Sequence, residues 1–404
     1  MSSPVRRAAA MIAVIALAGF GARFSPSREP AASPDPTPKV RPIRPGPEEA
    51  VALELVLRAS GQLRLSSEGI ADLRRALAPD GPPPEADRGA WRQHAPAIAL
   101  LIEGVQAGAP LLVEPGAGAD EPNLVPWQWL AFALLLRGWD RGLEGDVEGG
   151  LADMLLAVQF GRQTQGRTSW LVPTMVRHAI LSRGATEIEE YVRSFGSADA
   201  DLHGLAIEGL RPAAHDPALV WLAVRAECFA WVQAEITSFA AKPHLELPGV
   251  GIPRLDLPRL VAPLVLDAAE TRAAGIALCE QQAAYARLPY PNRPVSPPQF
   301  ADEAGPLGWL GNPVGHRILL AADGAISPLA QEDQARARLA GLWSLLSARR
   351  YWLRHGVLPD HDQLPLPRDP FTERPFRIVG GTITSAGDAA THPNTPLRWV
   401  VLPE

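Results

Sequence analysis

The chain has 404 residues, of which 47% are apolar and 20% charged, and it carries a net charge of −6. This length suits one large domain or two ordinary ones. Proteins that bind nucleic acids typically carry an excess of basic residues, whereas this chain is acidic. No nucleic-acid partner is therefore expected. Two cysteines, Cys228 and Cys279, are too few for a scaffold built on several disulfides. They are compatible with small buried apolar side chains or, in an oxidising compartment, with a single pair joining two helices.

The N-terminus has the pattern of an export signal. Arg6 and Arg7 precede a 15-residue apolar run, Ala8 to Ala22, which is short for a membrane-spanning helix. We predict that residues 1–24 form a signal peptide or a membrane anchor; an ordinary first helix is the alternative. Cleavage would release the chain into the periplasm or cell envelope. Retention would hold it on the periplasmic side of the inner membrane, with the membrane as a partner.

Residues 25–49 read as a disordered, proline-rich tether. This segment holds eight prolines among serine, arginine and acidic residues. Such a composition cannot bury a core and favours extended conformations. The tether therefore suits a spacer that holds a domain away from a membrane.

Residues 50–290 are expected to form a helical domain built from αα-hairpins. Val51, Leu53, Leu55, Val56 and Leu57 begin the first apolar face. Further helices are expected after Ser66-Ser67, and over 90–105, 126–143, 147–166, 169–181, 187–195, 199–210, 217–241 and 264–288. Loops are expected from 106 to 122 and over the proline-rich stretch Lys242 to Pro263.

The clearest hairpin lies between residues 126 and 166, with Gly145-Asp146 at its turn. Residues 132–162 look like a single tetratricopeptide unit, without a second copy in phase. Solenoids need about three repeats. The pattern therefore favours one hairpin of a bundle over a peptide-binding array.

The C-terminal third is divided into a Pro/Gly-rich linker over 291–327 and a small α+β module over 328–404. Ser327-Pro328 is a helix-start signal, and the amphipathic helix after it ends near Gly356. Phe376 to Val379 and Thr382 to Thr384 flank the turn Gly380-Gly381, and 397–402 supply a third strand. The predicted fold class is thus mainly α, with a C-terminal helix and a three-stranded antiparallel sheet.

One motif in this module resembles the C-terminal segment of type II secretion pseudopilins. Its parts, in order, are Tyr351, Gly356, Pro359, Leu364, Asp369-Pro370-Phe371, Pro375 and Ser385-Ala386-Gly387-Asp388. The chain is most similar to large, uncharacterised helical proteins of planctomycetes and myxobacteria that share this ending. Thr372 replaces the family's glycine, and the long apolar helix is not joined to the motif. The resemblance implies neither polymerisation into a pilus nor a calcium site.

Chemical motifs are sparse. The nucleophile elbow, the zinc-protease helix and the phosphate-binding loops are absent from the sequence, and no cofactor or metal is expected. Catalytic residues are therefore left unassigned. Four groups of residues could have a chemical role, but an ordinary structural role is favoured for each. They are a metal cluster or a solvated turn at His355, Asp360, His361 and Asp362; paired carboxylates or helix-start charges at Glu187, Glu189 and Glu190; an anion patch or a solvated helix face at Arg349, Arg350, Trp352 and Arg354; and a groove or core packing at Trp127 and Trp129.

Three functions follow from the sequence. The first expectation is a structural or interaction protein of the cell envelope, without enzymatic activity. The second is a component related to the type II secretion apparatus. The third is an envelope hydrolase of unrecognised type, which requires a pocket of convergent polar groups around a perturbed carboxylate or histidine.

Overall fold

A computed structural model describes most of the chain after residue 46. The described residues are 47–63, 67–77, 81–113, 124–166, 171–196, 198–211, 217–247, 252–256, 265–294, 296–300, 312–322, 327–360, 363–385 and 397–401. The predicted signal or anchor and most of the predicted tether lie outside this range. Among the described helices, none is both long and apolar enough to span a membrane.

The chain divides into two compact units. The first, here the main unit, comprises residues 43–220, 288–295 and 327–404. The second, here the insert unit, includes 221–287 and 296–326. The predicted boundaries at 290 and 327 lie within a few residues of two points at which the chain changes unit, 287/288 and 326/327. The division at 220/221 instead falls inside the predicted helical domain 50–290, and the predicted linker contains helix α13 (Pro313–Ala322).

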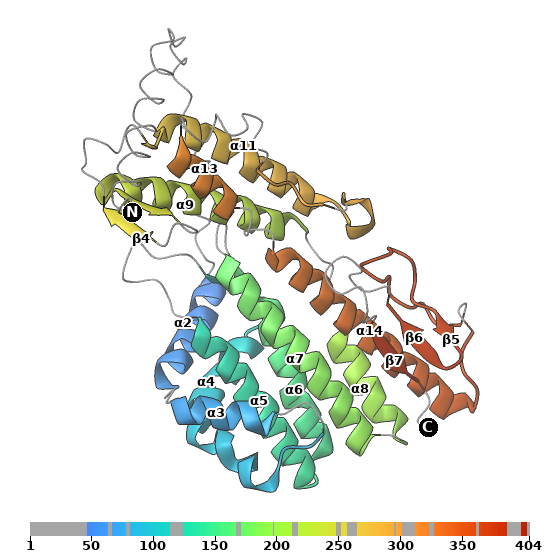
Figure 1. The fold of residues 1–404 in the computed structure, drawn as a ribbon. Coiled ribbons are helices and arrows are strands. Elements are labelled where there is room, and N and C mark those ends of the chain that lie inside the picture. Colours follow the sequence, from blue (N-terminus) through green and yellow to red (C-terminus); the bar gives the residue numbers. More distant parts are fainter. Residues whose placement is uncertain are drawn as a thin grey trace, which may run out of the picture. The chain divides into compact units, whose positions relative to one another are not determined.

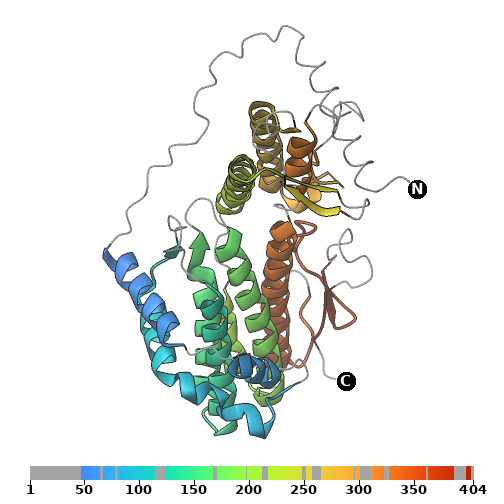
Figure 2. The ribbon, with the colours of Figure 1, turned by 60° about the vertical axis from the view of Figure 1, so that its left-hand side comes forward.

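The main unit is a helical bundle (Figures 1 and 2). Helices α7 and α8 are both in contact with α14, which is more than a hundred residues further along the chain, so the C-terminal helix completes the bundle. The helices are α2 (Pro47–Gln62), α3 (Ser67–Ala76), the 3-10 helix η1 (Glu85–His94), α4 (Ala95–Gln106), α5 (Val125–Leu143), α6 (Val147–Gln163), α7 (Leu171–Phe195), α8 (Ala200–Leu210) and α14 (Ser327–His355).

The predicted hairpin at Gly145-Asp146 is confirmed as α5 and α6. Gly145 has φ 97°, and the Asp146 carboxylate accepts a hydrogen bond from the Gly149 amide at 3.1 Å, which caps α6. The two helices approach closely at glycines. A Cβ on Gly138 would lie 2.7 Å from the Gly150 carbonyl oxygen, so a side chain there would force the helices apart.

Helix α7 corrects the sequence prediction of two helices over 169–181 and 187–195. It runs unbroken from Leu171 to Phe195. Gly184 marks a close approach to α6 instead of a break, because a Cβ there would lie 2.6 Å from Cγ2 of Val158. The stretch before α4 also differs from prediction, since residues 85–94 form a 3-10 helix.

Two small sheets lie in segments that were not predicted as strands: β1 (Leu111–Val113), β3 (His244–Leu247) and β4 (Ile252–Asp256) lie in predicted loops, and β2 (Thr164–Gly166) lies at the end of the helix predicted over 147–166. Strand β1 pairs in parallel with β2, a pairing between segments some 50 residues apart that leaves no local signal. Strands β3 and β4 form an antiparallel pair with a register irregularity. Pro253 lies in β4, and proline ordinarily argues against a strand, which explains the wrong prediction.

The tryptophans proposed as a groove belong to the core. Trp127 is fully buried and Trp129 is 6% exposed, so their ordinary role in core packing is confirmed and the alternative of a groove is wrong. The first predicted apolar face is also wrong in part. On α2 the buried residues are Ala52, Val56 and Ala59, whereas Val51 and Leu57 are among the exposed large apolar side chains.

The insert unit contains most of α9 (Pro217–Ala241), with α11 (Ala268–Arg287), α13, β3 and β4. Cys228 on α9 and Cys279 on α11 form a disulfide, which settles the alternative that the sequence left open. Asn312 joins α11 to α13, because its side-chain oxygen accepts from the Asp267 and Gly315 amides while its nitrogen donates to the Thr271 hydroxyl.

The C-terminal sheet agrees with the predicted fold class. Strands β5 (Ile378–Val379), β6 (Thr382–Thr384) and β7 (Arg398–Val400) are antiparallel in the order β5-β6-β7. Both glycines of the turn, Gly380 and Gly381, have positive φ. The sheet is held to α14 by Arg349, whose guanidinium donates to the carbonyls of Val400 and Val401 at 3.1 and 2.9 Å.

Candidate functional site

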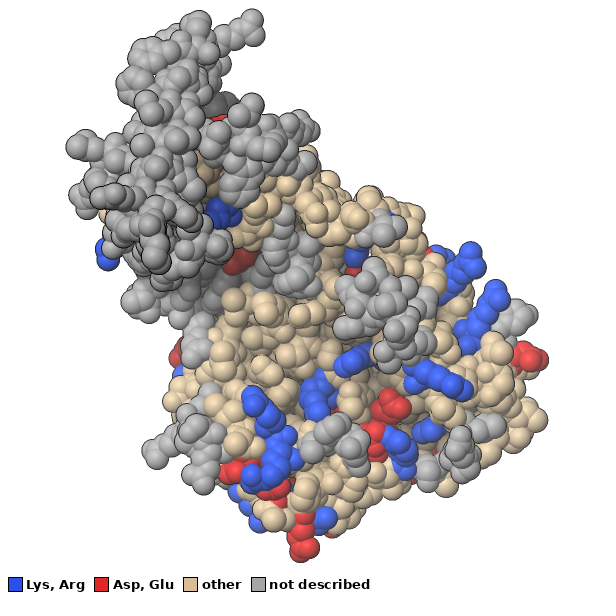
Figure 3. Space-filling view, in the orientation of Figure 1, with Lys and Arg blue, Asp and Glu red and all other residues tan. Residues whose placement is uncertain are grey.

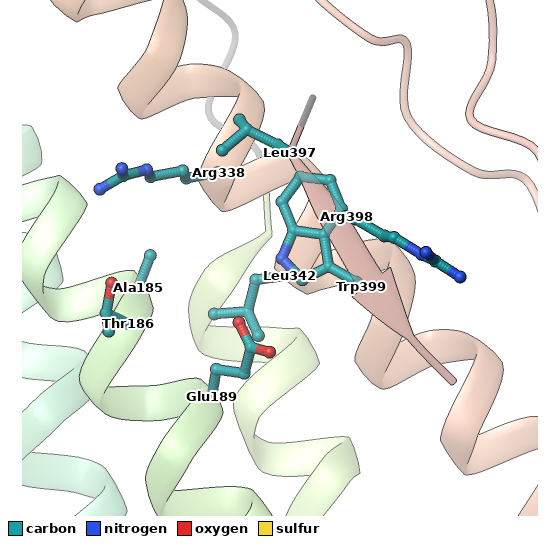
Figure 4. Close-up of a pocket in the computed structure, with 8 residues that line it drawn as sticks. All are labelled: Ala185, Thr186, Glu189, Arg338, Leu342, Leu397, Arg398 and Trp399. Atoms are coloured by element: carbon teal, nitrogen blue, oxygen red, sulfur yellow. The ribbon is translucent and has the colours of Figure 1, made fainter. Parts of the chain in front are cut away.

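A pocket lies where the C-terminal sheet meets the bundle (Figure 4). Its volume is about 160 Å³. Three structural elements contribute its walls: Ala185, Thr186 and Glu189 from α7; Arg338 and Leu342 from α14; and Leu397, Arg398 and Trp399 from the last strand and the residue before it. These segments are far apart in the sequence, so folding alone brings them together.

The periodicity of each element determines which side chains face the pocket. Residues four apart share one face of a helix, which aligns Ala185 with Glu189 and Arg338 with Leu342. Side chains alternate along a strand. Accordingly, the Trp399 indole faces the pocket, whereas the Arg398 side chain extends away from the other labelled residues (Figure 4).

Trp399 is seated against a glycine of α14. It is 5% exposed, and its ring meets Phe376 edge-on with centroids 6.0 Å apart. A Cβ on Gly341 would lie 2.1 Å from the Trp399 ring. Gly341 therefore provides the space that lets the indole close this side of the pocket.

A buried ionic cluster joins α7 and α14. Glu332 is 1% exposed; it contacts the His178 ring and lies 3.6 Å from the Arg177 guanidinium. Its neighbour Asp333 forms an ion pair with Arg293. Buried charges need such partners, so this cluster specifies how the two helices meet.

The pocket holds two opposite charges that are not paired with each other. Burial raises the pKa of the Glu189 carboxyl, although the nearby positive charges of Arg193 and Arg349 act in the opposite direction. Both guanidiniums are already engaged, Arg193 by Glu190 and Arg349 by the sheet carbonyls. Among the described residues, neither Glu189 nor Arg338 has a hydrogen-bond or ion-pair partner.

An uncharged polar group of the pocket is the hydroxyl of Thr186. The Thr186 hydroxyl donates a hydrogen bond to the Ser182 carbonyl at 3.2 Å. A threonine nucleophile would need a base to accept this proton. Among the lining residues, Glu189 is the one group that could act as such a base, and no histidine is present.

The three glutamates of α7 have separate environments. They lie in the C-terminal half of the helix, so the interpretation as helix-start charges is wrong. Glu187 is 3% exposed, accepts from Trp139 Nε1 at 2.6 Å and pairs with Arg183. Its pKa is raised by burial. Glu190 pairs with Arg193 at the surface, which leaves Glu189 as the carboxylate in the pocket.

The other sequence candidates do not form a site in the described chain. His361 and Asp362 lie outside the described residues, and the His355 ring packs on Tyr351 at 4.3 Å. Within the part of the chain that the structure describes, no three metal-ligating side chains cluster.

The proposed anion patch is dispersed as well. Arg349 binds the sheet, and Arg354 lies 3.3 Å from Asp201. On the face shown in Figure 3, acidic side chains lie among the basic ones over the main unit. This mixture is typical of a solvated surface and gives no continuous basic surface.

Hydrogen bonds join two parts of the C-terminal motif, the segment at Asp369 and the segment at Ser385. The Asp369 carboxylate accepts from the Phe371 amide at 3.1 Å and from the Ser385 hydroxyl at 2.8 Å. Both side chains are buried, so two parts of the motif that are 16 residues apart stabilise one turn. Gly387 and Asp388 lie outside the described residues.

Sequence reasoning singled out only Glu189 among the eight residues that line the pocket. Arg338 resembles an ordinary solvated helix residue, and Trp399 an ordinary strand residue. These residues are recognised as pocket residues only because the fold brings three separate segments together. No family model matches the chain, and neither a curated protein nor a solved structure is similar to it.

Proposed function

We propose that this protein is an exported or membrane-anchored interaction protein of the cell envelope. The observation that carries the proposal is the disulfide between Cys228 and Cys279, both fully buried. Disulfides persist in oxidising compartments and are rare in the cytosol. The basic and apolar N-terminus and the proline-rich segment after it support the same location.

A binding role is the second part of the proposal. The pocket offers two oppositely charged side chains beside an indole, without an activated nucleophile. Such a constellation is suited to recognition by charge and shape. The bundle and the tether would then present this pocket away from a membrane.

Fractionation combined with thiol labelling tests the location. The full chain, expressed with its own N-terminus, is expected in the envelope fraction, with no thiol reactive under denaturing conditions until a reductant exposes two. N-terminal sequencing then distinguishes a cleaved signal from a retained anchor. The Cys228→Ser variant, with one reactive thiol before reduction, calibrates the labelling. Recovery in the cytoplasm with both thiols reduced would contradict the proposal.

A relationship to the secretion apparatus is the first alternative. It is supported by the resemblance of the C-terminal segment and by the turn that Asp369 and Ser385 stabilise. It predicts that the full chain co-purifies with secretion components. The Ser385→Ala variant should weaken this association, whereas Thr384→Ser, an exposed change on the same strand, should not.

An envelope hydrolase is the second alternative, favoured by the raised pKa of Glu189 in a pocket. It predicts release of soluble fragments from purified envelope material, abolished by Glu189→Gln. Equal release by the wild type and by this variant would remove Glu189 from any such reaction.

A further inference from the structure

Two opposite charges face one cavity without satisfying each other. Glu189 and Arg338 both line the pocket and both are half-buried. They do not form an ion pair with each other, and no other described side chain bonds directly to either. Arg193 and Arg349 act on Glu189 through their positive charges, but neither Glu189 nor Arg338 has a hydrogen-bonded partner among the residues that the structure describes. A ligand that supplies both hydrogen-bonding partners therefore gains binding free energy.

The two charged side chains border the same cavity from different helices, Glu189 from α7 and Arg338 from α14. In Figure 4 the Arg338 side chain extends from α14 toward α7, and the Glu189 carboxylate lies near Leu342, below the indole of Trp399. A guanidinium binds a carboxylate through two parallel hydrogen bonds. A carboxylate, in turn, accepts from an ammonium group. The Thr186 oxygen can accept a further hydrogen bond while its hydrogen points to the Ser182 carbonyl.

The remaining walls and the size define the rest of the ligand. Ala185, Leu342, Leu397 and Trp399 give the pocket an apolar side. Its volume of about 160 Å³ is below the roughly 300–1,000 Å³ of pockets that hold drug-sized ligands. A molecule of a few heavy atoms with a short apolar branch fits this space.

We infer that the pocket binds a free α-amino acid with a small apolar side chain, its carboxylate on Arg338 and its ammonium group on Glu189. The inference rests on the binding role proposed above. The apolar branch would lie against Leu342 and Trp399. A ligand with one charge alone would leave either the guanidinium or the carboxylate without a partner.

Calorimetric titration of the full chain with three probes tests this pairing. L-leucine carries both charges, N-acetyl-L-leucine lacks the ammonium group and L-leucinamide lacks the carboxylate. L-leucine is expected to bind, and each capped probe to bind about tenfold or more weakly, because a charge-assisted hydrogen bond is lost. L-alanine and L-valine, run in parallel, report on the apolar side.

Variants assign each charge to its residue. Arg338→Gln should bind L-leucine and L-leucinamide with equal, weakened affinity, because it can no longer sense the carboxylate. Glu189→Gln should likewise cease to distinguish L-leucine from N-acetyl-L-leucine. Arg336→Gln and Glu190→Gln are matched controls, since neither residue lines the cavity: Arg336 lies 3.8 Å from Asp333, and Glu190 is paired with Arg193. Both should bind as the wild type does.

Several outcomes would overturn the inference. Absence of binding by L-leucine, L-alanine and L-valine to a folded wild type would do so, as would equal binding of capped and free probes. An Arg336→Gln variant as impaired as Arg338→Gln would also contradict it. Because these titrations do not depend on location, an exported, disulfide-bonded protein that binds none of the probes would lose this inference and keep its proposed location.

Discussion

The main unit and the insert unit hold their helices together in different ways. The main unit has a continuous core in which Trp127, Trp139 and Tyr191 are fully buried, and glycines let its helices approach closely. The insert unit has a much smaller core around Val232, Ile318 and a disulfide. Small units bury a smaller share of their surface and rely more on cross-links. The comparison predicts that the two units respond to different perturbations.

Removing a buried charge should give the largest decrease in the free energy of unfolding, and this decrease should be confined to the main unit. Glu332→Ala would leave His178 and Arg177 without their carboxylate. We expect the free energy of unfolding of the main unit to fall by about 3–5 kcal/mol, because an unpaired buried charge is costly. Hydrogen exchange of the full chain, followed by mass spectrometry, would locate the loss.

Arg336→Ala is the matched control for this variant. Arg336 lies 3.8 Å from Asp333 and its side chain is 37% exposed, so its loss should cost about 0–1 kcal/mol. Equal loss of protection in α9 and α11 would contradict the separation of the two units.

The disulfide should matter next, and only in the insert unit. Replacing both cysteines by alanine opens a loop of 51 residues and should cost about 2–4 kcal/mol, because the unfolded chain regains freedom. Exchange is expected to rise in α9, α11 and α13 while the main unit keeps its protection. A uniform rise over both units would show that they unfold together.

The contact between Gly341 and Trp399 predicts a smaller, local effect. Gly341→Ala would place a methyl group within the Trp399 ring, and overpacking of this kind costs about 1–3 kcal/mol. We expect faster exchange at the β7 amides and weaker ligand binding in the pocket. Gly61→Ala on α2 is the control: a Cβ there meets no atom within 4 Å, and alanine should stabilise that helix by about 0.5–1 kcal/mol.

The smallest predicted effect depends on pH. Burial lowers the pKa of His203 on α8 below its ordinary value of 6.5, with the charges of Arg349 and Arg350 acting in the same direction. The unfolded chain therefore binds a proton more readily than the folded one. Stability is retained above pH 6.5 and declines as the pH falls from 6.5 toward the lowered pKa of the folded state.

His203→Gln should reduce this slope, by at most about 1.4 kcal/mol per pH unit. Unfolding midpoints measured between pH 5 and 8 would check it. An unchanged slope would assign the acid sensitivity to other groups, of which His94, with its pKa also lowered by burial, is the first to test.

Local features of the fold were predictable from the sequence. The caps at Asp146 and Asp199 are short-range signals, and the structure places both at helix starts, where their carboxylates accept from backbone amides. The turn at Gly380-Gly381 is equally local. Such features depend on neighbouring residues, so a single sequence is enough to identify them.

Non-local features were not predictable in the same way. Gly184 looks like a helix breaker, and only the approach of Val158 explains why the helix continues through it. The pocket joins α7 to residues about 150 and 210 positions later, so no window of sequence contains it. The sequence identified Glu189 only as one of three neighbouring glutamates. The packing of the helices determines that Glu189 is the one that faces the cavity.

The division of the chain has a consequence for the order of assembly. The residues of the insert unit precede α14, the helix that completes the main unit against α7 and α8. During synthesis, the two cysteines emerge before Ser327 does. The disulfide can therefore close while the main unit still lacks its last helix, and the pocket is assembled only when residues 338–399 arrive. Recognition would then be the last property that the chain acquires.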